Sequence, residues 1–329
     1  MTSSSDPSPA PKPRDDRSNS AADAPIWVLT GPTASGKTAL ALDLAEATGR
    51  EILSMDSMAV YRHMDIGTAK PDAAERARVP HHLIDLVEPS EGFDTAQWCE
   101  RADSTLQRLR ESGRSALFVG GTPLYLMAFF KGMMEGPAAQ PELRKRLEAR
   151  EAEAPGSLHE ELSQRDPEAA ARIHRRDLRR LVRALEVLEI TGQTISSQQE
   201  QFEREGWRRP CRVVHVTRER DDLHQRVRDR TERMLDQGLL QETEAIERGC
   251  GFSRTAGAAI GYAECRDFLR GRYKDREELR NRIRRNTHKL IRRQTTWLRR
   301  LPEIRRVPTA ECTEVGRLLR EFEGGGGGE

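Results

Sequence analysis

The segment GPTASGKT, which runs from Gly31 to Thr38, constrains this chain of 329 residues more than any other part of it. It matches the pattern G-x-x-x-x-G-K-[ST] in full, follows an apolar run at 26–30 and opens a helical pattern at 38–48. Backbone N–H groups of such a loop and of the helix N-terminus point at phosphate oxygens, and its lysine adds a positive charge. We therefore predict a phosphate site made of Gly31, Pro32, Thr33, Ala34, Ser35, Gly36, Lys37 and Thr38. The Thr38 hydroxyl is the candidate ligand for Mg²⁺.

Short apolar runs alternate with helical patterns along much of the chain. The runs that we predict as strands are 26–30, 51–55, 81–87, 115–121 and 211–217. Strands that alternate with helices favour a parallel α/β sheet. After Thr217 the pattern is helical to about residue 300.

The strand pattern is missing between 132 and 206, where the chain is charged and has helical spacing. Because another strand pattern follows, this segment is predicted to be a helical insertion into the α/β core. The N-terminal residues are rich in Ser, Pro, Asp and Ala, and the chain ends in EGGGGGE, so both ends are expected to be disordered. The predicted parts are a tail at 1–24, the first part of the core at 25–131, the insertion at 132–206, the second part of the core with basic helices at 207–310, and a tail at 311–329.

Asp56 stands directly after the predicted strand at 51–55. In open α/β sheets the ligand crevice lies outside the carboxyl ends of the strands, so an acid there is expected to be functional. The alternative is a loop or helix-capping acid with a structural role. Phosphate loops that hydrolyse nucleotides usually work with an aspartate at the end of a nearby strand, but the run at 115–121 ends in Gly-Gly-Thr. Asp85 remains an alternative for that role.

Cysteine usage and hydropathy restrict the cellular setting. The five cysteines include no CxxC pair, which gives no sign of a zinc site or a redox pair. Scattered cysteines suit a reducing cytosol, and no apolar stretch approaches the ~20 residues of a membrane span. The N-terminus lacks the apolar centre of a signal peptide. We therefore expect a cytoplasmic protein that does not contact a membrane, and nothing in the sequence demands more than a monomer.

The segment 279–300 reads LRNRIRRNTHKLIRRQTTWLRR and contains nine basic residues without an acid. Its apolar residues have helical spacing, so one side should pack on the core while the other presents positive charge. Such a surface is expected for contact with a polyanion, although a basic amphipathic helix can also lie on a membrane or bind a calmodulin-like partner. Arg179, Arg180 and Arg183 form a second basic cluster, for which a solvated helical face is the simpler explanation. Taken together, the two clusters favour nucleic acid as the partner.

Several motifs, in their order and spacing, resemble those of the tRNA dimethylallyltransferases, also called tRNA isopentenyltransferases. The motifs are GPTASGKT, DSMAVYRHMDIGTAKP, HHLID, VGGTPLYL, RRLVRALEV, RERDDLHQRVRDRTERMLDQGL, AAIGYAE and RRQTTWLRR. The resemblance runs from about Ile26 to Arg306 and leaves out only the tails. It implies a P-loop NTPase-like parallel sheet with a helical insertion domain and a helical C-terminal part.

The resemblance also implies a reaction and a set of roles. In that family a dimethylallyl group moves from dimethylallyl pyrophosphate to N6 of the adenosine on the 3′ side of the anticodon, in tRNAs that read codons beginning with U, and Mg²⁺ is required. Asp56 matches the general base, Lys37 lies in the loop that holds the pyrophosphate, and Arg220 matches an arginine that contacts this group.

The same resemblance implies contacts with the anticodon stem-loop of tRNA. The matching positions are Asp56, Ser57, Met58, Ala59, Thr122, Arg179, Arg180, Leu181, Val182, Arg183, Gly261, Tyr262, Arg292, Arg293, Gln294, Trp297 and Arg299. Two positions depart from the family pattern, because His288 replaces an arginine and Ala263 replaces a lysine. The family's contacts at those two positions are therefore not carried over to this chain, whereas Arg292 keeps the positive charge of the lysine that it replaces.

Three other functions compete with this one. A small-molecule kinase or ATPase could use the same loop, but it would give the basic segments no role. An enzyme that prenylates free adenine nucleotides would need neither the insertion nor the basic segment at 279–300. A non-catalytic RNA-binding protein would not need an intact loop together with Asp56.

Overall fold

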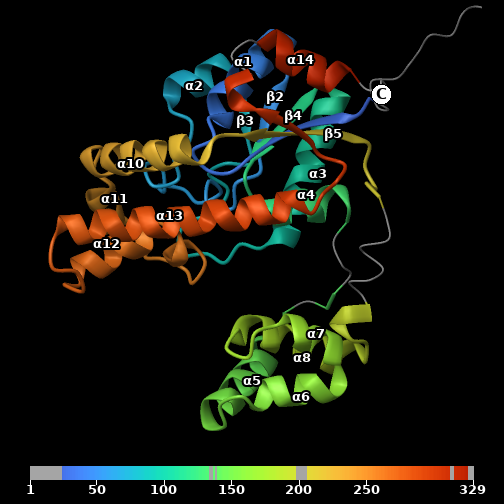
Figure 1. Ribbon diagram of the computed structural model, residues 1–329, viewed down its shortest axis with the longest axis vertical. Coiled ribbons are helices and arrows are strands. Elements are labelled where there is room, and N and C mark those ends of the chain that lie inside the picture. Colours follow the sequence, from blue (N-terminus) through green and yellow to red (C-terminus); the bar gives the residue numbers. More distant parts are fainter. Residues whose placement is uncertain (1–23, 133–135, 138, 198–205, 312–314, 325–329) are drawn as a thin grey trace, which may run out of the picture.

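The computed structural model describes residues 24–132, 136–137, 139–197, 206–311 and 315–324. These residues form an α/β core and a smaller helical lobe (Figure 1). The elements in chain order are β1 (Ile26–Thr30), α1 (Lys37–Thr48), β2 (Glu51–Ser54), α2 (Ala73–Arg78), β3 (His81–His82), α3 (Thr95–Glu111), β4 (Ala116–Gly120), α4 (Pro123–Phe130), α5 (Pro141–Glu153), α6 (Ser157–Arg165), α7 (Pro167–Arg172), α8 (Leu178–Thr191), β5 (Cys211–Thr217), α10 (Arg220–Asp236), α11 (Leu239–Arg248), η1 (Ala256–Ala258), α12 (Tyr262–Leu269), α13 (Arg276–Arg299), β6 (Arg305–Pro308), η2 (Thr309–Glu311) and α14 (Val315–Glu323).

The six strands form one sheet in the order β3-β2-β4-β1-β5-β6, and every pair is parallel. β1 therefore lies in the interior of the sheet, with β4 on one side and β5 on the other. Since all strands point the same way, their carboxyl ends meet at one edge, where a parallel sheet binds its ligands. The predicted parallel sheet of the P-loop type is confirmed.

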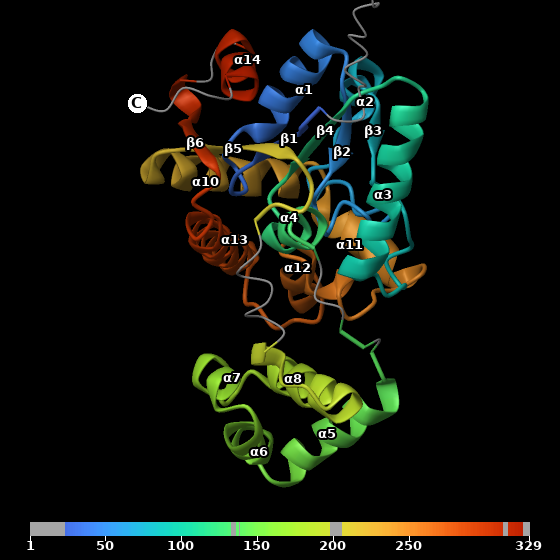
Figure 2. The ribbon, with the colours of Figure 1, turned by 90° about the vertical axis from the view of Figure 1, so that its right-hand side faces the viewer.

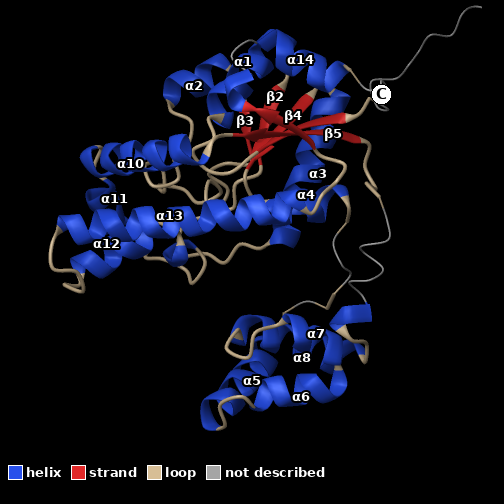
Figure 3. Ribbon diagram, in the orientation of Figure 1, coloured by secondary structure: helices blue, strands red, loops and turns tan. Residues whose placement is uncertain are grey.

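Helices cover both faces of the sheet (Figure 3). Side chains of successive strand residues point to opposite faces. Val28, Phe118 and Val213 pack with α3, α4 and the helices that follow β5, whereas Leu29 and Leu117 pack with α1 and α14. Because both faces are buried, the strands read as continuous apolar runs, which is why the sequence pattern revealed them.

The helical insertion predicted for 132–206 forms a lobe of its own. Helices α5 to α8 pack around buried leucines and lie apart from the sheet (Figure 2). Along the chain, the lobe comes after α4 and before β5. The ends of the predicted insertion are not fully visible, since 133–135, 138 and 198–205 lie outside the described residues.

Two sequence predictions about the ends of the sheet are wrong. The strand expected at 81–87 contains only His81 and His82, because Leu83 and Asp85 have φ angles of 63° and 54° that break the extended chain. The tail expected at 311–329 contains α14, which closes one face of the sheet and stacks Phe322 on Trp27 with ring centroids 4.6 Å apart. The sequence analysis also missed β6. Residues 1–23 and 325–329 lie outside the described residues, so disorder there stays a prediction.

None of the helices within the described ranges is long and apolar enough to cross a bilayer. The longest, α13, has 24 residues and carries charge along most of its length.

Glu186 on α8 is the most deeply buried carboxylate among the described residues of the helical lobe. It accepts hydrogen bonds from Arg144 at 2.7 and 2.8 Å, from Arg183 at 2.7 Å and from the backbone N–H of Gln140 at 2.8 Å. Burial alone would raise the pKa of Glu186, but these hydrogen bonds outweigh burial and hold the pKa below its ordinary value of 4.5.

We predict that Glu186→Gln lowers the free energy of unfolding at pH 7 by about 1–3 kcal/mol, because charge-assisted hydrogen bonds are lost. A lowered folded-state pKa stabilises the protein above about pH 4.5 and ceases to do so as the pH falls through the folded-state value. The native chain should therefore lose more stability than the variant between pH 7 and pH 4. Urea unfolding at both pH values measures this. Glu189→Gln, an exposed change on the same helix, is the matched control. Equal stabilities of the two variants would contradict the prediction.

Candidate active site

The candidate site lies at the carboxyl edge of the sheet, where the segments after four strands meet. The phosphate loop follows β1, Asp56 follows β2, Gly121 and Thr122 follow β4, and Arg218 follows β5. Two glycines allow this close approach. A Cβ at Gly120 would lie 2.3 Å from the carbonyl oxygen of Met55, and a Cβ at Gly121 would lie 2.9 Å from that of Gly31. The GGT sequence at the end of β4 therefore serves packing, because only glycine fits at these two positions.

The phosphate loop leads into α1 through Gly36, whose φ of 91° is left-handed. Lys37 donates from Nζ to the carbonyl oxygen of Pro32 at 3.3 Å, so its ammonium group lies across the loop. Burial lowers the pKa of Lys37 to about 8; nearby Asp56 opposes this effect and Arg230 adds to it. An anion bound in the loop would offset both the desolvation of the Lys37 ammonium group and its repulsion by Arg230. The predicted loop residues thus form one site with an incompletely compensated positive charge.

Three arginines that the sequence analysis did not select surround the loop. Arg218 donates from Nε to the carbonyl oxygen of Ser35 at 3.1 Å, and Arg226 donates from Nε to that of Ala34 at 3.0 Å. Arg230 donates to the carbonyl oxygen of Thr68 at 3.3 Å. Burial lowers the pKa of Arg230, which Asp56 opposes and Arg233 reinforces.

Arg226, Arg230 and Arg233 have helical spacing on α10 and line one cleft of about 840 Å³ together with Lys37 and Thr38. Arg220, the arginine chosen from the sequence, is exposed at the first position of α10 and does not line this cleft. Its role toward the pyrophosphate stays a prediction. The periodicity of α10 could have revealed the arginines that line the cleft. Arg226, Arg230 and Arg233 each lie one position before a buried residue of the helix.

Asp56 occupies a half-buried position between these cations. Its Oδ1 accepts hydrogen bonds from the backbone N–H groups of Met58 at 2.8 Å and Ala59 at 3.4 Å. The charge of Asp56 acts on both Lys37 and Arg230. The structural alternative is therefore correct in part, because the carboxylate caps a turn, yet the same carboxylate faces the cations of the phosphate site. Its hydrogen bonds to described residues all fall on Oδ1, which leaves Oδ2 for a substrate.

Gln294 joins the basic helix α13 to this site. Its Oε1 accepts from the backbone N–H of Thr33 at 3.0 Å, and its Nε2 donates to the carbonyl oxygen of Gly121 at 2.7 Å. The side chain is buried, so both ends of the amide are used within the protein. Thr122 makes a further connection, since its Oγ1 accepts from the backbone N–H of Ser57 at 3.2 Å.

The turn at 65–70 forms the wall of the cleft opposite α10. Glu242 accepts from the backbone N–H groups of Ile66 at 3.0 Å and Asp65 at 3.2 Å, and the hydroxyl of Tyr262 donates to Glu242. A Cβ at Gly67 would lie 2.3 Å from the Tyr262 ring, so this position also requires glycine. The motifs around residues 67 and 262, which are far apart in the sequence, are therefore parts of one wall.

The suggestion that Asp85 serves the phosphate loop is wrong. Asp85 follows β3 at the edge of the sheet, and it accepts hydrogen bonds from Lys70 at 2.6 Å and Arg76 at 2.8 Å. Lys70, which also bonds Asp65 at 2.8 Å, is almost fully buried in this ion pair. The ion pair of Lys70 with Asp85 stabilises the turn at 65–70, so Asp85 has a structural role.

The residues predicted to contact RNA differ in exposure: Asp56, Ser57, Met58 and Thr122 are half-buried, and Ala59 is buried. The side chains that reach the surface belong to Arg179, Arg180, Arg292, Arg293, Trp297 and Arg299. Those of Leu181, Val182, Tyr262 and Gln294 are buried, and Gly261 is buried with them. Direct side-chain contact is thus corrected to a packing role for this second set. Arg183 is half-buried and paired with Glu186 at 2.7 Å.

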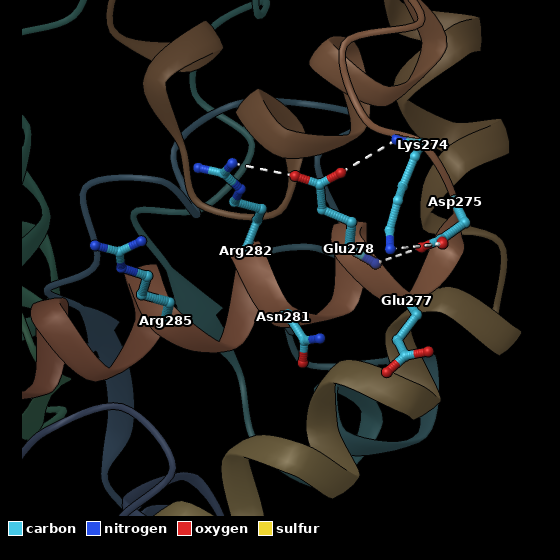
Figure 4. Close-up of a pocket in the computed structure, with 7 residues that line it drawn as sticks. All are labelled: Lys274, Asp275, Glu277, Glu278, Asn281, Arg282 and Arg285. Carbon is cyan, nitrogen blue, oxygen red and sulfur yellow. Dashed lines mark hydrogen bonds and ion pairs between the residues drawn. The ribbon is translucent and has the colours of Figure 1, made fainter.

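A smaller cleft of about 380 Å³ lies at the start of α13, away from the phosphate loop (Figure 4). Glu278 accepts from Arg282 at 3.1 Å, and Asp275 accepts from the backbone N–H of Glu278 at 2.8 Å. This cleft is therefore the capped N-terminus of a helix.

The described part of the site offers Mg²⁺ one candidate protein ligand, the hydroxyl of Thr38. Among the described residues, no group of three or more His, Cys, Asp and Glu side chains could hold a metal ion. Thr38 is exposed at the start of α1 and lines the larger cleft. Mg²⁺ usually binds through one or two protein ligands together with substrate phosphates, so a single hydroxyl beside a bound diphosphate is compatible with it.

Comparison with known proteins yields one family. The IPP transferase family model matches residues 59–301, a range that begins just after the phosphate loop and Asp56. The tRNA dimethylallyltransferase of Syntrophobacter fumaroxidans is 41% identical over 302 residues, which cover 91% of this chain and 88% of that protein. The tRNA dimethylallyltransferase of Methylococcus capsulatus is 44% identical over 306 residues, which cover 90% and 96% of the two chains.

Solved structures agree with these relatives. The full-length tRNA isopentenylpyrophosphate transferase of Bacillus halodurans has 34% sequence identity and a TM-score of 0.66, covering 91% of this chain and 97% of that one. A eukaryotic dimethylallyltransferase acting on tRNA, at 24% identity and a TM-score of 0.74, shares the fold and covers 92% and 77% of the two chains. Since the family model spans most of the chain and the relatives match along nine-tenths of it, the chain belongs to the IPP transferase family.

Proposed function

We propose that this protein transfers a dimethylallyl group from dimethylallyl pyrophosphate to N6 of the adenosine 3′-adjacent to the anticodon, in tRNAs that read codons beginning with U. One observation carries the proposal: Asp56 faces the cations of a phosphate site, and Gln294 joins that site to an exposed basic helix. The names of the relatives support the same reaction. The enzyme is a prenyltransferase, and the anticodon stem-loop is its macromolecular substrate.

The leaving group accounts for the cations. As N6 attacks the first carbon of the dimethylallyl group, the bond from that carbon to oxygen breaks and pyrophosphate departs with the electron pair. Negative charge on the departing oxygens is stabilised by the loop N–H groups, Lys37, Arg226 and Arg230. Mg²⁺, when bound beside Thr38, would supply further positive charge to the same oxygens. A loop that binds phosphate without an aspartate at the end of β4 suits departure of pyrophosphate better than attack by water.

The proton of the amine accounts for Asp56. An exocyclic amine is a weak nucleophile, and its proton must leave as the C–N bond forms. A carboxylate within hydrogen-bond reach can accept that proton, and Oδ2 is the oxygen that remains for it. Asp56 lies close enough to Lys37 and Arg230 for its charge to raise the pKa of both, which places it beside the cations that would hold the leaving group.

The RNA must deliver its adenosine to this edge of the sheet. A base stacked in an anticodon loop has to turn outward to reach a pocket, and RNA loops are recognised through such splayed bases and through their shape. Exposed Arg292, Arg293 and Arg299 on α13 provide charge for the backbone, and Trp297, 43% exposed, provides a ring for stacking. The helical lobe presents Arg179 and Arg180 as a second basic surface. We further propose that the protein works as a monomer in the cytoplasm.

Two competing functions use the same loop and predict other products. A small-molecule kinase or ATPase would leave the basic face of α13 without a role. A transferase that acts on free adenine nucleotides would need neither this face nor the helical lobe.

One incubation separates these functions. The protein is mixed with labelled dimethylallyl pyrophosphate and bulk tRNA, AMP or neither, and ATP hydrolysis is measured in parallel. We expect label in tRNA alone, with Mg²⁺ present, because only RNA engages both basic surfaces. Label in AMP, or ATP turnover without label in tRNA, would overturn the proposal. Omitting Mg²⁺ tests whether the reaction requires this ion. Sequencing the labelled tRNAs tests whether they read codons that begin with U.

The second prediction concerns Asp56→Asn, which keeps an oxygen to accept from the Met58 and Ala59 N–H groups but cannot accept the proton. We expect kcat to fall roughly 10²–10⁴-fold, the usual contribution of a positioned base, while tRNA affinity changes little. Asp56→Ala, which also removes the turn cap, should lower stability in addition. Single-turnover kinetics and gel-shift titrations measure the two effects. Near-native turnover of the asparagine variant would rule out the role of base.

The third prediction distinguishes the arginines of α10. Arg230→Gln should lower kcat/KM for the donor about 10²-fold or more, because Arg230 lines the cleft beside Lys37. Arg220→Gln should lower it less than tenfold, since Arg220 is exposed outside that cleft. Steady-state kinetics at saturating tRNA give the comparison. A larger loss for Arg220→Gln than for Arg230→Gln would restore the assignment made from the sequence.

A further inference from the structure

Two histidines stack between α10 and α13, outside the cleft that holds the chemistry. The rings of His224 and His288 have centroids 4.3 Å apart and an interplanar angle of 29°. The two helices pack side by side here (Figure 1). Nε2 of His288 is buried and has no hydrogen-bond partner among the described residues. A polar nitrogen in this state is costly unless something else binds it.

The surroundings of the pair are positive from both helices. Burial lowers the pKa of His288, and His224, Arg228, Arg292 and Arg220 lower it further. The apolar layer beneath these groups is made of Leu223, Val227 and Ile291 from the same two helices, with Ala34 of the phosphate loop against it.

We propose that His224 and His288 form a proton-linked binding site for a phosphate group of the RNA backbone. The half-buried ring of His288 would turn to expose Nε2, which would donate a hydrogen bond to a phosphate oxygen lying among the guanidinium groups of Arg228 and Arg292. The inference rests on the proposed function, because RNA is the polyanion that the basic face of α13 is inferred to bind. His288 would couple RNA binding to the uptake of a proton, which an arginine with its fixed positive charge cannot do.

The chemistry of the site, a phosphate oxygen among cations, could be satisfied by RNA or by the pyrophosphate of the donor. RNA is favoured because Arg292 continues into the exposed row of Arg293 and Arg299 on α13. The donor has its own cations, which line the cleft beside Lys37, and neither histidine lines that cleft.

The sign of the pH dependence follows from the charges. Without RNA, burial and the positive neighbours lower the pKa of His288 and so disfavour its charged form. A bound phosphate reverses this preference, so binding takes up a proton and the affinity rises as the pH falls through the value at which the bound imidazole titrates. Uptake of one proton increases affinity by at most tenfold per pH unit.

The test is the affinity of a fluorescent anticodon stem-loop RNA for the full chain between pH 8.0 and pH 6.0, at constant ionic strength. We expect roughly three- to tenfold tighter binding at pH 6.0 for the native protein, within the limit of tenfold per pH unit set by one proton. The double variant His224→Asn with His288→Asn should change less than about twofold. His288→Arg should bind tightly and without pH dependence, because its charge is fixed. His63→Asn, which alters an exposed histidine beside Glu88, is the matched control and should keep the native dependence.

Each outcome decides a separate point. An equal pH dependence in the native protein and the double asparagine variant would overturn the inference, and so would a flat native profile. Inorganic pyrophosphate, titrated with the same variants, should bind them all equally; a loss confined to pyrophosphate would place the histidines in the donor site instead. Transfer of label to tRNA at pH 8.0 is measured on the same preparations. Transfer that persists while the pH dependence fails leaves the proposed function intact, whereas absence of transfer from the native protein rejects the function itself.

Discussion

The amide of Gln294 is the contact on which the arrangement of the site depends. One side chain from α13 accepts from the phosphate loop and donates to the loop after β4, across 261 and 173 residues of chain. Because the amide is buried and each of its ends has one partner, the helix cannot shift without breaking one of the two hydrogen bonds. The outer face of the same helix carries the exposed arginines. A surface suited to a polyanion is thereby attached rigidly to the place where pyrophosphate would leave.

The phosphate site is held together against its own repulsion. Lys37, Arg218, Arg226 and Arg230 gather around one loop, and the pKa values of Lys37 and Arg230 are lowered mainly by burial and to a smaller extent by neighbouring cations. Hydrogen bonds from Arg218 and Arg226 to loop carbonyl oxygens, and the packing of α10 on α13, hold the cations in place against this unfavourable free energy. Positive charge is then in place before the substrate arrives, which is what stabilises negative charge as it develops.

The sequence predicted those features that depend on local pattern. The phosphate loop, the interior strands and the helical insertion each have a pattern within about a dozen residues, and the structure agrees with them. The ends of the sheet failed for physical reasons: left-handed φ angles end β3 early, and α14 is a short helix whose stability depends on tertiary packing against α1 and β5, including the stack of Phe322 on Trp27. Residue roles were harder still, since Leu181 and Gln294 lie in motifs whose other residues are predicted to contact RNA but are themselves buried. The arginines of α10 could have been found from helical spacing, whereas the reach of Gln294 across the fold could not, because no local pattern encodes a tertiary contact.

Two explanations were open for Asp56, a turn-capping acid and a catalytic acid or base. The geometry allows one carboxylate to do both, because the turn is capped by Oδ1 alone. A carboxylate that rotates freely is a poor base, because its acceptor oxygen must be found in the right direction at the moment of proton transfer. The N–H groups of Met58 and Ala59 bind Oδ1 and so restrict the orientation of Oδ2. The turn that begins at Asp56 is itself connected to the loop after β4 through Ser57 and Thr122. The structural role of the acid is therefore the means by which it is positioned for the proposed chemistry.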